Sequence, residues 1–204
     1  MIGPQSHILM CPPDFYGIEY EINPWMNRAR QADHPTAVEQ WRALHSHIEA
    51  AGARVSLMES VRGLPDLVFT ANAALTIGRQ AVLSHFRHSQ RQGEEPHFRR
   101  RLEELRFEVL ETPADFNFEG AGDALFCGDT LYAGYRMRSD AAGHQAIGQL
   151  LGVRVLPVEL VDARYYHLDT CFCPLAPDAA IWYPPAFDHY GQRAVEEHVP
   201  TLIV

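Results

Sequence analysis

The chain has 204 residues, of which 47% are hydrophobic and 21% charged, as is ordinary for a soluble globular protein. Its formal net charge of −9 argues against nucleic acid and anionic lipid as partners. No stretch approaches the roughly 18 apolar residues of a membrane span, and the start, MIGPQSHILM, lacks the basic region of a signal peptide. Because four cysteines are too few for a disulfide scaffold, we expect a cytoplasmic protein with reduced thiols.

The first third of the chain predicts a strand, a long loop, a helix and a second strand. HILMCPP (7–13) is strand-like, and the loop DFYGIEYEINPWMN (14–27) that follows contains aromatic residues, which argue against disorder. TAVEQWRALHSHIEAA (36–51) carries apolar residues at helical spacing, and ARVSLME (53–59) is strand-like again.

After this irregular start, one order of elements returns three times: two strands joined by a turn, then a helix, then a strand. The predicted sets cover residues 73–111, 123–160 and 171–204, and their turns recur at about fifty residues. A unit of this kind cannot bury its own apolar face, so neighbouring units must pack side by side. The spacing favours a repeated ββαβ unit over a generic α/β domain.

In YYHLDTCFCPL, polar or sulfur-bearing residues occupy every second position: His167, Asp169, Cys171 and Cys173. Alternation predicts an extended strand that places all four on one face. Such a strand would separate Cys171 from His167 by roughly 13 Å, too far for a nucleophile and its base. Because no CxxC or HxxxH accompanies the stretch, we also expect no metal site here.

Other polar residues stand where predicted strands meet loops, in INPWM, LPDLVFTAN and FNFEGAGDALF: Asn23, Asp66, Asn72, Glu119 and Asp123. Ends of strands are where α/β scaffolds tend to place ligands. Taken singly, FEGAGD is more typical of a tight turn, and the Asp of PDLVFTAN is more typical of a turn or cap residue.

Taken together, MCPPDFYGIEYEINPWM, LPDLVFTANAAL, FEGAGDALF and YYHLDTCFCPL resemble the guanidino-group modifying enzymes, the pentein superfamily. That superfamily includes the amidinotransferases, arginine deiminases and dimethylargininases, and the likeness is closest to bacterial arginine dihydrolase-like proteins. The resemblance implies an α/β fold, a pentein-type propeller of ββαβ units with about four of the five units present. It also implies one domain over residues 1–204 that lacks the C-terminal unit.

The resemblance further implies a hydrolase that acts on guanidino C–N bonds of arginine or a similar small molecule, without metal or cofactor. His167 and Glu119 would be catalytic, and the implied substrate-binding residues are Asp66, Asp169, Asn72, Asn23, Asp123, Arg91 and Arg138. Arg91 and Arg138 would hold an α-carboxylate, a role for which Arg87 and Arg136 compete. The alternatives are an amidinotransferase and a non-catalytic homologue that binds arginine-like cations.

In this superfamily, a cysteine of the fifth unit attacks the guanidinium carbon and forms a covalent amidino-cysteine intermediate. The resemblance therefore implies that the nucleophile is not in this chain, and we expect the 204-residue chain alone to be inactive. Open strand edges would also favour self-association into a homo-oligomer.

Overall fold

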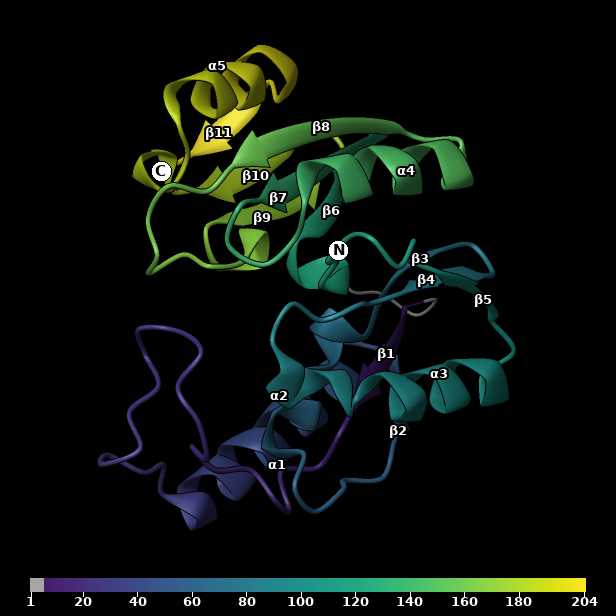
Figure 1. Cartoon of the computed structure of the whole chain (residues 1–204), viewed down its shortest axis with the longest axis vertical. Coiled ribbons are helices and arrows are strands. Elements are labelled where there is room, and N and C mark those ends of the chain that lie inside the picture. The colour runs from purple at the N-terminus through teal and green to yellow at the C-terminus, as the bar shows by residue number, and fades with distance from the viewer. Residues whose placement is uncertain (1–5) are drawn as a thin grey trace. The chain divides into compact units, whose positions relative to one another are not determined.

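The computed structural model describes residues 6–204 (Figure 1), so the start on which the prediction about a signal peptide partly rests lies outside the described residues. The chain forms an N-terminal unit that ends at Thr70 and a C-terminal unit from Ala71 to Val204. None of the helices described is long and apolar enough to span a bilayer. That the two units form one domain stays a prediction.

The N-terminal unit is a β–α–β unit, in which β1 (His7–Met10) and β2 (Arg54–Leu57) pair in parallel. Helix α1 (His34–Ala50) connects the two strands, as predicted. It begins where the Asp33 side chain accepts the backbone N–H of Thr36 at 2.9 Å, a typical N-cap. The predicted strand, helix and strand of this part of the chain are confirmed.

The C-terminal unit contains three successive ββαβ sets (Figure 1). Their elements, in chain order, are β3 (Ala74–Ile77), β4 (Gln80–Leu83), α2 (Ser89–Gln92), α3 (Glu95–Glu104) and β5 (Glu108–Glu111); β6 (Ala124–Cys127), β7 (Thr130–Tyr135), α4 (Ala141–Leu151) and β8 (Arg154–Glu159); and β9 (Phe172–Ala176), β10 (Ala179–Trp182), α5 (His189–His198) and β11 (Thr201–Ile203). In each set the first two strands are antiparallel, and the last strand pairs in parallel with the middle one. The predicted repeat is therefore confirmed, as three open three-stranded sheets.

Glycine makes two of these hairpins possible. Gly78 and Gly128 stand in the turns after β3 and β6, with φ of 57° and 62°. Backbone angles in this left-handed region suit the tight turns of hairpins and disfavour residues with a Cβ. The turns predicted at these glycines are confirmed.

The second and third sets share one apolar core. The ring of Tyr132, on β7, lies 5.0 Å from the ring of Phe172, on β9, and both side chains are buried. Trp182 and Phe187, from the third set, belong to the same cluster. Burial of each such side chain contributes roughly 1.5–3 kcal/mol, so packing between sets stabilises them more than either hairpin could alone.

The strand predicted over YYHLDTCFCPL (165–175) is wrong in its first seven residues, because a short 3-10 helix, η4 (Leu168–Thr170), follows His167 and β9 begins at Phe172. The Thr170 hydroxyl donates to the His167 carbonyl at 2.6 Å, and Leu168 is buried in the core. A local side-chain bond and a buried leucine thus override the alternating pattern.

The predicted separation of Cys171 from His167 is wrong for the same reason, since Cys171 Sγ lies 3.9 Å from the His167 carbonyl oxygen. Burial raises the pKa of Cys171 to about 12. Its thiol stays protonated near neutral pH, so Cys171 is not an activated nucleophile.

Helix α4 contributes a buried histidine that makes stability depend on pH. His144 Nε2 donates to the Gly134 carbonyl at 2.8 Å, and Nδ1 is buried with no hydrogen-bond partner among the residues described. Burial lowers the pKa of His144 from 6.5 to about 4. A depressed histidine pKa leaves stability unaffected above the unfolded-state value and reduces it as the pH falls from about 6.5 to 4.

We therefore expect His144 alone to reduce the free energy of unfolding by about 3 kcal/mol between pH 7 and pH 4. Urea titrations across this range measure the effect. His144→Gln should flatten the pH dependence, whereas His189→Gln, at an exposed position, should leave it unchanged. Equal pH dependence in the wild type and His144→Gln would contradict the prediction.

Candidate active site

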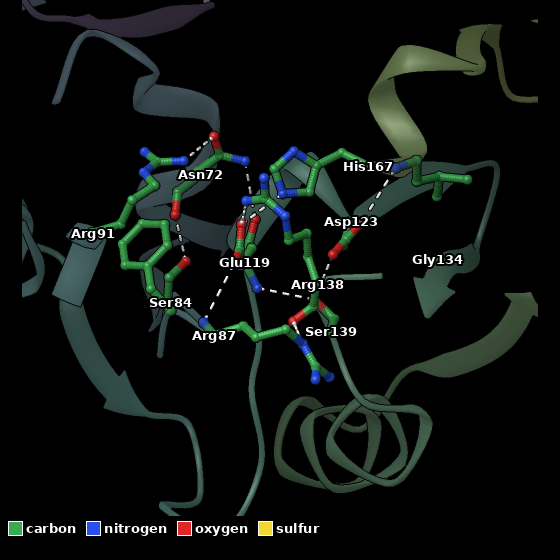
Figure 2. A network of polar contacts seen from close by, with 12 residues as sticks. Asn72, Ser84, Arg87, Arg91, Glu119, Asp123, Gly134, Arg138, Ser139 and His167 are labelled. Carbon is green, nitrogen blue, oxygen red and sulfur yellow. Dashed lines mark hydrogen bonds and ion pairs between the residues drawn. The ribbon is translucent and has the colours of Figure 1, made fainter. Parts of the chain in front are cut away.

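Each of the three sets has a polar residue shortly before its first strand, and Glu119 and His167 occupy equivalent positions in theirs. Short 3-10 helices precede these strands: η2 (Thr70–Ala73), η3 (Gly120–Gly122) and η4. Asn72 lies in the first, Glu119 precedes the second, and His167 precedes the third. Figure 2 shows that the side chains of these three residues lie together. The repeat thus brings residues that are about fifty positions apart in the sequence into one cluster within the C-terminal unit.

Glu119 and His167 form a buried pair, with His167 Nε2 2.6 Å from Glu119 Oε2. Burial raises the pKa of Glu119, but the His167 hydrogen bond and the charges of His167 and Arg138 outweigh it and bring the pKa to about 2. Burial lowers the pKa of His167, and this exceeds the opposing effect of Glu119. A neutral imidazole that donates its Nε2–H to a carboxylate keeps Nδ1 as a base, which suits proton transfer.

Arg138 shares the same carboxylate oxygen. Its Nη1 donates to Glu119 Oε2 at 3.0 Å, and its guanidinium lies over the Tyr166 ring at 4.8 Å. The Tyr166 ring in turn lies 4.9 Å from that of His167. Arg138 therefore neutralises Glu119 and packs beside the imidazole. Figure 2 shows its contact with Glu119.

A second buried ion pair holds Asn72. Arg91 donates to Glu94 through Nε at 3.0 Å and Nη2 at 2.7 Å, and through Nη1 to Asn72 Oδ1 at 2.9 Å. The Asn72 Nδ2 then donates to the Glu119 carbonyl at 3.4 Å. This chain of contacts fixes the orientation of the Asn72 amide beside the Glu119–His167 pair. Glu94 was not predicted, since its place in the charged run GEEPHF resembles the exposed start of a helix.

Asp123 lies fully buried between β6 and the segment that carries His167. Its Oδ1 accepts the Leu168 backbone N–H at 3.2 Å, and its Oδ2 accepts the Ser139 hydroxyl at 2.6 Å. Ser139 was not predicted either, because an isolated serine after a strand carries no sequence signal.

The structure places the remaining predicted carboxylates and Asn23 as follows. Asp169 follows His167 by two residues and is exposed to solvent. Asp66 is buried in η1 (Pro65–Val68), where its charge adds to the effect of burial in raising the pKa of Tyr16. Asn23 accepts the backbone N–H of Trp25 at 2.9 Å in the long loop. Asp66 and Asn23 belong to the N-terminal unit, and their convergence with Glu119 and His167 stays a prediction.

The two alternative arginines form ion pairs nearer to solvent. Arg87 lies 2.6 Å from Asp140, and Arg136 lies 2.7 Å from Glu159. Both side chains are about a third or more exposed, whereas Arg91 and Arg138 are almost fully buried. Burial beside the Glu119–His167 pair thus favours Arg91 and Arg138 over their competitors for a role at the site.

Gly122 leaves space that the Asn72 amide fills. A Cβ at Gly122 would lie 2.1 Å from Asn72 Nδ2 and 3.6 Å from His167 Cγ. We expect Gly122→Ala to displace Asn72 and to lower the free energy of unfolding by about 1–3 kcal/mol, measured by urea denaturation. In the control Gly17→Ala, the nearest atom to the new Cβ is Gln31 Oε1 at 3.9 Å. Equal stability of the two variants would contradict this packing.

Comparisons with known proteins identify relatives of this chain. The chain is 50% identical, over 95% of its length, to the bifunctional arginine dihydrolase/ornithine cyclodeaminase ArgZ of Synechocystis, of which it covers 28%. It is 37% identical, over 96% of its length, to an N(G),N(G)-dimethylarginine dimethylaminohydrolase of Mycobacterium tuberculosis, of which it covers 64%. The chain thus spans less than a third of the length of the cyanobacterial relatives it matches.

Solved structures show the same likeness. The substrate-bound N-terminal domain of ArgZ, in a cysteine-to-serine variant, matches with a TM-score of 0.92 and 48% identity over 97% of this chain and 75% of that one. A dimethylarginine dimethylaminohydrolase of Pseudomonas aeruginosa, complexed with citrulline, matches with a TM-score of 0.79 and 20% identity over 98% of this chain and 76% of that one. At this identity, the match shows the fold alone.

The predicted resemblance to arginine dihydrolases and dimethylargininases is therefore confirmed. The sequence profile of the family described as "N,N dimethylarginine dimethylhydrolase, eukaryotic" matches residues 19–199, most of the chain. The chain belongs to that family of guanidino-group modifying enzymes.

Proposed function

We propose that the protein carrying this chain hydrolyses the guanidino C–N bonds of arginine or an arginine-like substrate. The buried Glu119–His167 pair, with its Nε2–Oε2 distance of 2.6 Å, carries the proposal. The pair lies in a chain whose sequence is 48% identical to that of an arginine dihydrolase domain solved with its substrate bound.

The chemistry requires a nucleophile and a proton donor on either side of the guanidinium carbon. The proposed nucleophile is a cysteine thiolate from a further unit of the protein, in line with the reaction intermediate bound covalently to a variant of ArgZ. The cysteine becomes a thiolate by giving its proton to Nδ1 of His167. Its sulfur then forms a bond to the guanidinium carbon, and the C–N bond to the leaving amine breaks as His167 passes that proton to the leaving nitrogen. Water then attacks the same carbon, gives a proton back to His167 and releases the thiolate.

Glu119 holds His167 in the tautomer that this sequence needs. Because the His167 hydrogen bond and nearby positive charge lower the pKa of Glu119 to about 2, its carboxylate is ionised near neutral pH and accepts the Nε2–H there. Nδ1 is then the nitrogen that gains and loses a proton in each half of the reaction. Arg138 prevents the glutamate from stabilising the imidazolium too strongly, since it shares the same oxygen.

The proposed substrate contacts follow the charges of an amino acid with a guanidinium side chain. Carboxylates pair with a planar guanidinium, which is the role proposed for Asp66 and Asp169, while Asn23 and Asn72 line the site. Arg91 and Arg138 would bind the α-carboxylate. Since each already contacts a buried glutamate, a substrate carboxylate would share the guanidinium with that glutamate.

We also propose the number of repeated units, the cellular compartment and the oligomeric state of the protein. The open sheets would be blades of a pentein-type propeller of five units, about four of which lie in this chain. A cytoplasmic location and a homo-oligomer are proposed with it. The absence of a metal or cofactor stays a prediction.

Product analysis tests the proposed function. The natural protein that contains this chain is incubated with L-arginine, agmatine or N,N-dimethylarginine, and ammonia, dimethylamine, citrulline and ornithine are measured. Release of ammonia or dimethylamine, lost in His167→Asn, is the expected result. Ornithine formed from arginine only when an acceptor amine is present, together with the amidinated acceptor, would favour the amidinotransferase. Binding of arginine without any product would favour the non-catalytic homologue.

A further inference from the structure

One buried carboxylate links the three segments around the Glu119–His167 pair. Asp123 Oδ1 accepts the backbone N–H of Leu168 at 3.2 Å, and Oδ2 accepts the Ser139 hydroxyl at 2.6 Å. Ser139 Oγ itself accepts the backbone N–H of Glu119 at 3.0 Å. Figure 2 shows Asp123 with its bond toward Ser139 on one side and toward the segment of His167 on the other.

Each end of this link adjoins one member of the pair. Leu168 follows His167 directly, so the peptide group between them is held by Asp123. Glu119 is held through its own amide by Ser139. The backbone positions from which both side chains extend are thus tied to a single carboxyl group, although the residues lie 48 positions apart in the chain.

The surroundings of Asp123 leave little room for adjustment. The Gly134 N–H donates to the Asp123 carbonyl at 2.8 Å. A Cβ at Gly134 would lie 3.0 Å from Leu168 Cβ and 3.4 Å from Asp123 Oδ1. Since its side chain is fully buried and both of its oxygens already accept hydrogen bonds, Asp123 presents no surface to a small molecule.

We propose that Asp123 is a positioning residue, which sets the distance between His167 and Glu119 through the Leu168 amide and the Ser139 hydroxyl and does not bind substrate. A bond of 2.6 Å between ring nitrogen and carboxylate is near the short end for such contacts, so small backbone shifts weaken it. Asp123 thereby acts on the reaction only through the residues that perform it.

The protonation of the Asp123 carboxyl group indicates which replacement of Asp123 preserves its positioning role. Burial raises the pKa of Asp123 well above its usual range, against the opposing effect of the Ser139 hydrogen bond. Negative charge is therefore disfavoured at this position, and the link depends on hydrogen bonding. Asparagine keeps the size of the side chain and an acceptor for the Leu168 amide, and its Nδ2–H donates to Ser139 Oγ where Asp123 accepts from it. Alanine removes both contacts.

Proton NMR of the natural protein tests the link without any assay of activity. The Nε2–H of His167, in a short bond to a carboxylate, gives a ring proton signal far downfield. This signal should disappear in Asp123→Ala and in Ser139→Ala, and persist in Asp123→Asn and in the exposed control Asp178→Ala. If Asp123→Ala fails to fold, Ser139→Ala decides. Persistence in both alanine variants, or equal loss in Asp123→Asn, overturns the proposal.

A kinetic measurement adds the consequence for catalysis, and this part rests on the proposed function. Misplacing a catalytic group by about 1 Å lowers a rate by about 10²-fold, so Asp123→Ala should lower kcat to that extent with little change in KM. Asp123→Asn should recover most of kcat. If no variant or wild type releases product while the NMR result holds, the proposed function fails and the positioning role stands. An equal kcat in Asp123→Ala and wild type overturns the positioning role.

Discussion

Replacing Arg91 by methionine is expected to lower the free energy of unfolding by about 3–5 kcal/mol. The guanidinium and the Glu94 carboxylate are almost completely buried and lie 2.7 Å apart. Without Arg91, Glu94 would keep a buried charge that has lost its bidentate partner. Asn72 would lose the donor to its Oδ1 as well, so the damage would extend to the cluster around Glu119.

A double-mutant cycle separates the lost pair from the isolated charge. Arg91→Met/Glu94→Gln removes both charges, and we expect it to be more stable than Arg91→Met alone. Urea denaturation of the natural protein measures the four species of the cycle, which are the wild type, Arg91→Met, Glu94→Gln and the double variant. The control is Arg193→Met, which breaks an exposed pair with Glu197 at 3.6 Å and should change stability by about 0.5 kcal/mol or less. Similar losses in Arg91→Met and Arg193→Met would contradict the buried pair.

The sequence predicts the repeated elements well because their signals are local and are repeated. The hairpin turns lie at Gly78 and Gly128, and each hairpin is followed by an amphipathic helix and a strand. Each of these elements is determined by residues within about fifteen positions of one another. The same reasoning fails at His167 because the alternation in HLDTCFC has two explanations. A strand and a 3-10 turn with one buried leucine give similar patterns over so few residues.

Residues whose role depends on distant partners escape prediction from the sequence. Glu94 reads as an exposed acid at the start of a helix, and only the fold turns it toward Arg91 in the interior. Ser139 has no motif, and its bonds to Asp123 and to the Glu119 amide join residues far apart in the chain. Asp123 was predicted, as part of FEGAGD, to bind substrate, and the positioning role proposed for it depends on its burial and on partners that lie far away in the sequence.

Replacing His167 by asparagine, or Glu119 by glutamine, is expected to lower the rate of guanidino hydrolysis by about 10²–10⁴-fold, the usual range for loss of a general acid–base group. Both variants must be measured in the natural protein that contains this chain, with circular dichroism to confirm folding. Glu119→Gln leaves Arg138 without its carboxylate, so its stability has to be compared with that of His167→Asn.

The dependence of kcat on pH distinguishes the two roles. Because the Glu119 charge raises the pKa of His167, Glu119→Gln should move the limb that reports His167 to lower pH. The glutamate itself, with a pKa of about 2, should add no limb within the usual assay range. The lowered pKa of Glu119 also stabilises the folded state above pH 4.5, and this stabilisation is lost as the pH falls toward 2. An unshifted limb in Glu119→Gln, or a rate within threefold of wild type in either variant, would mean that this pair does not transfer the proton and that another group protonates the leaving amine.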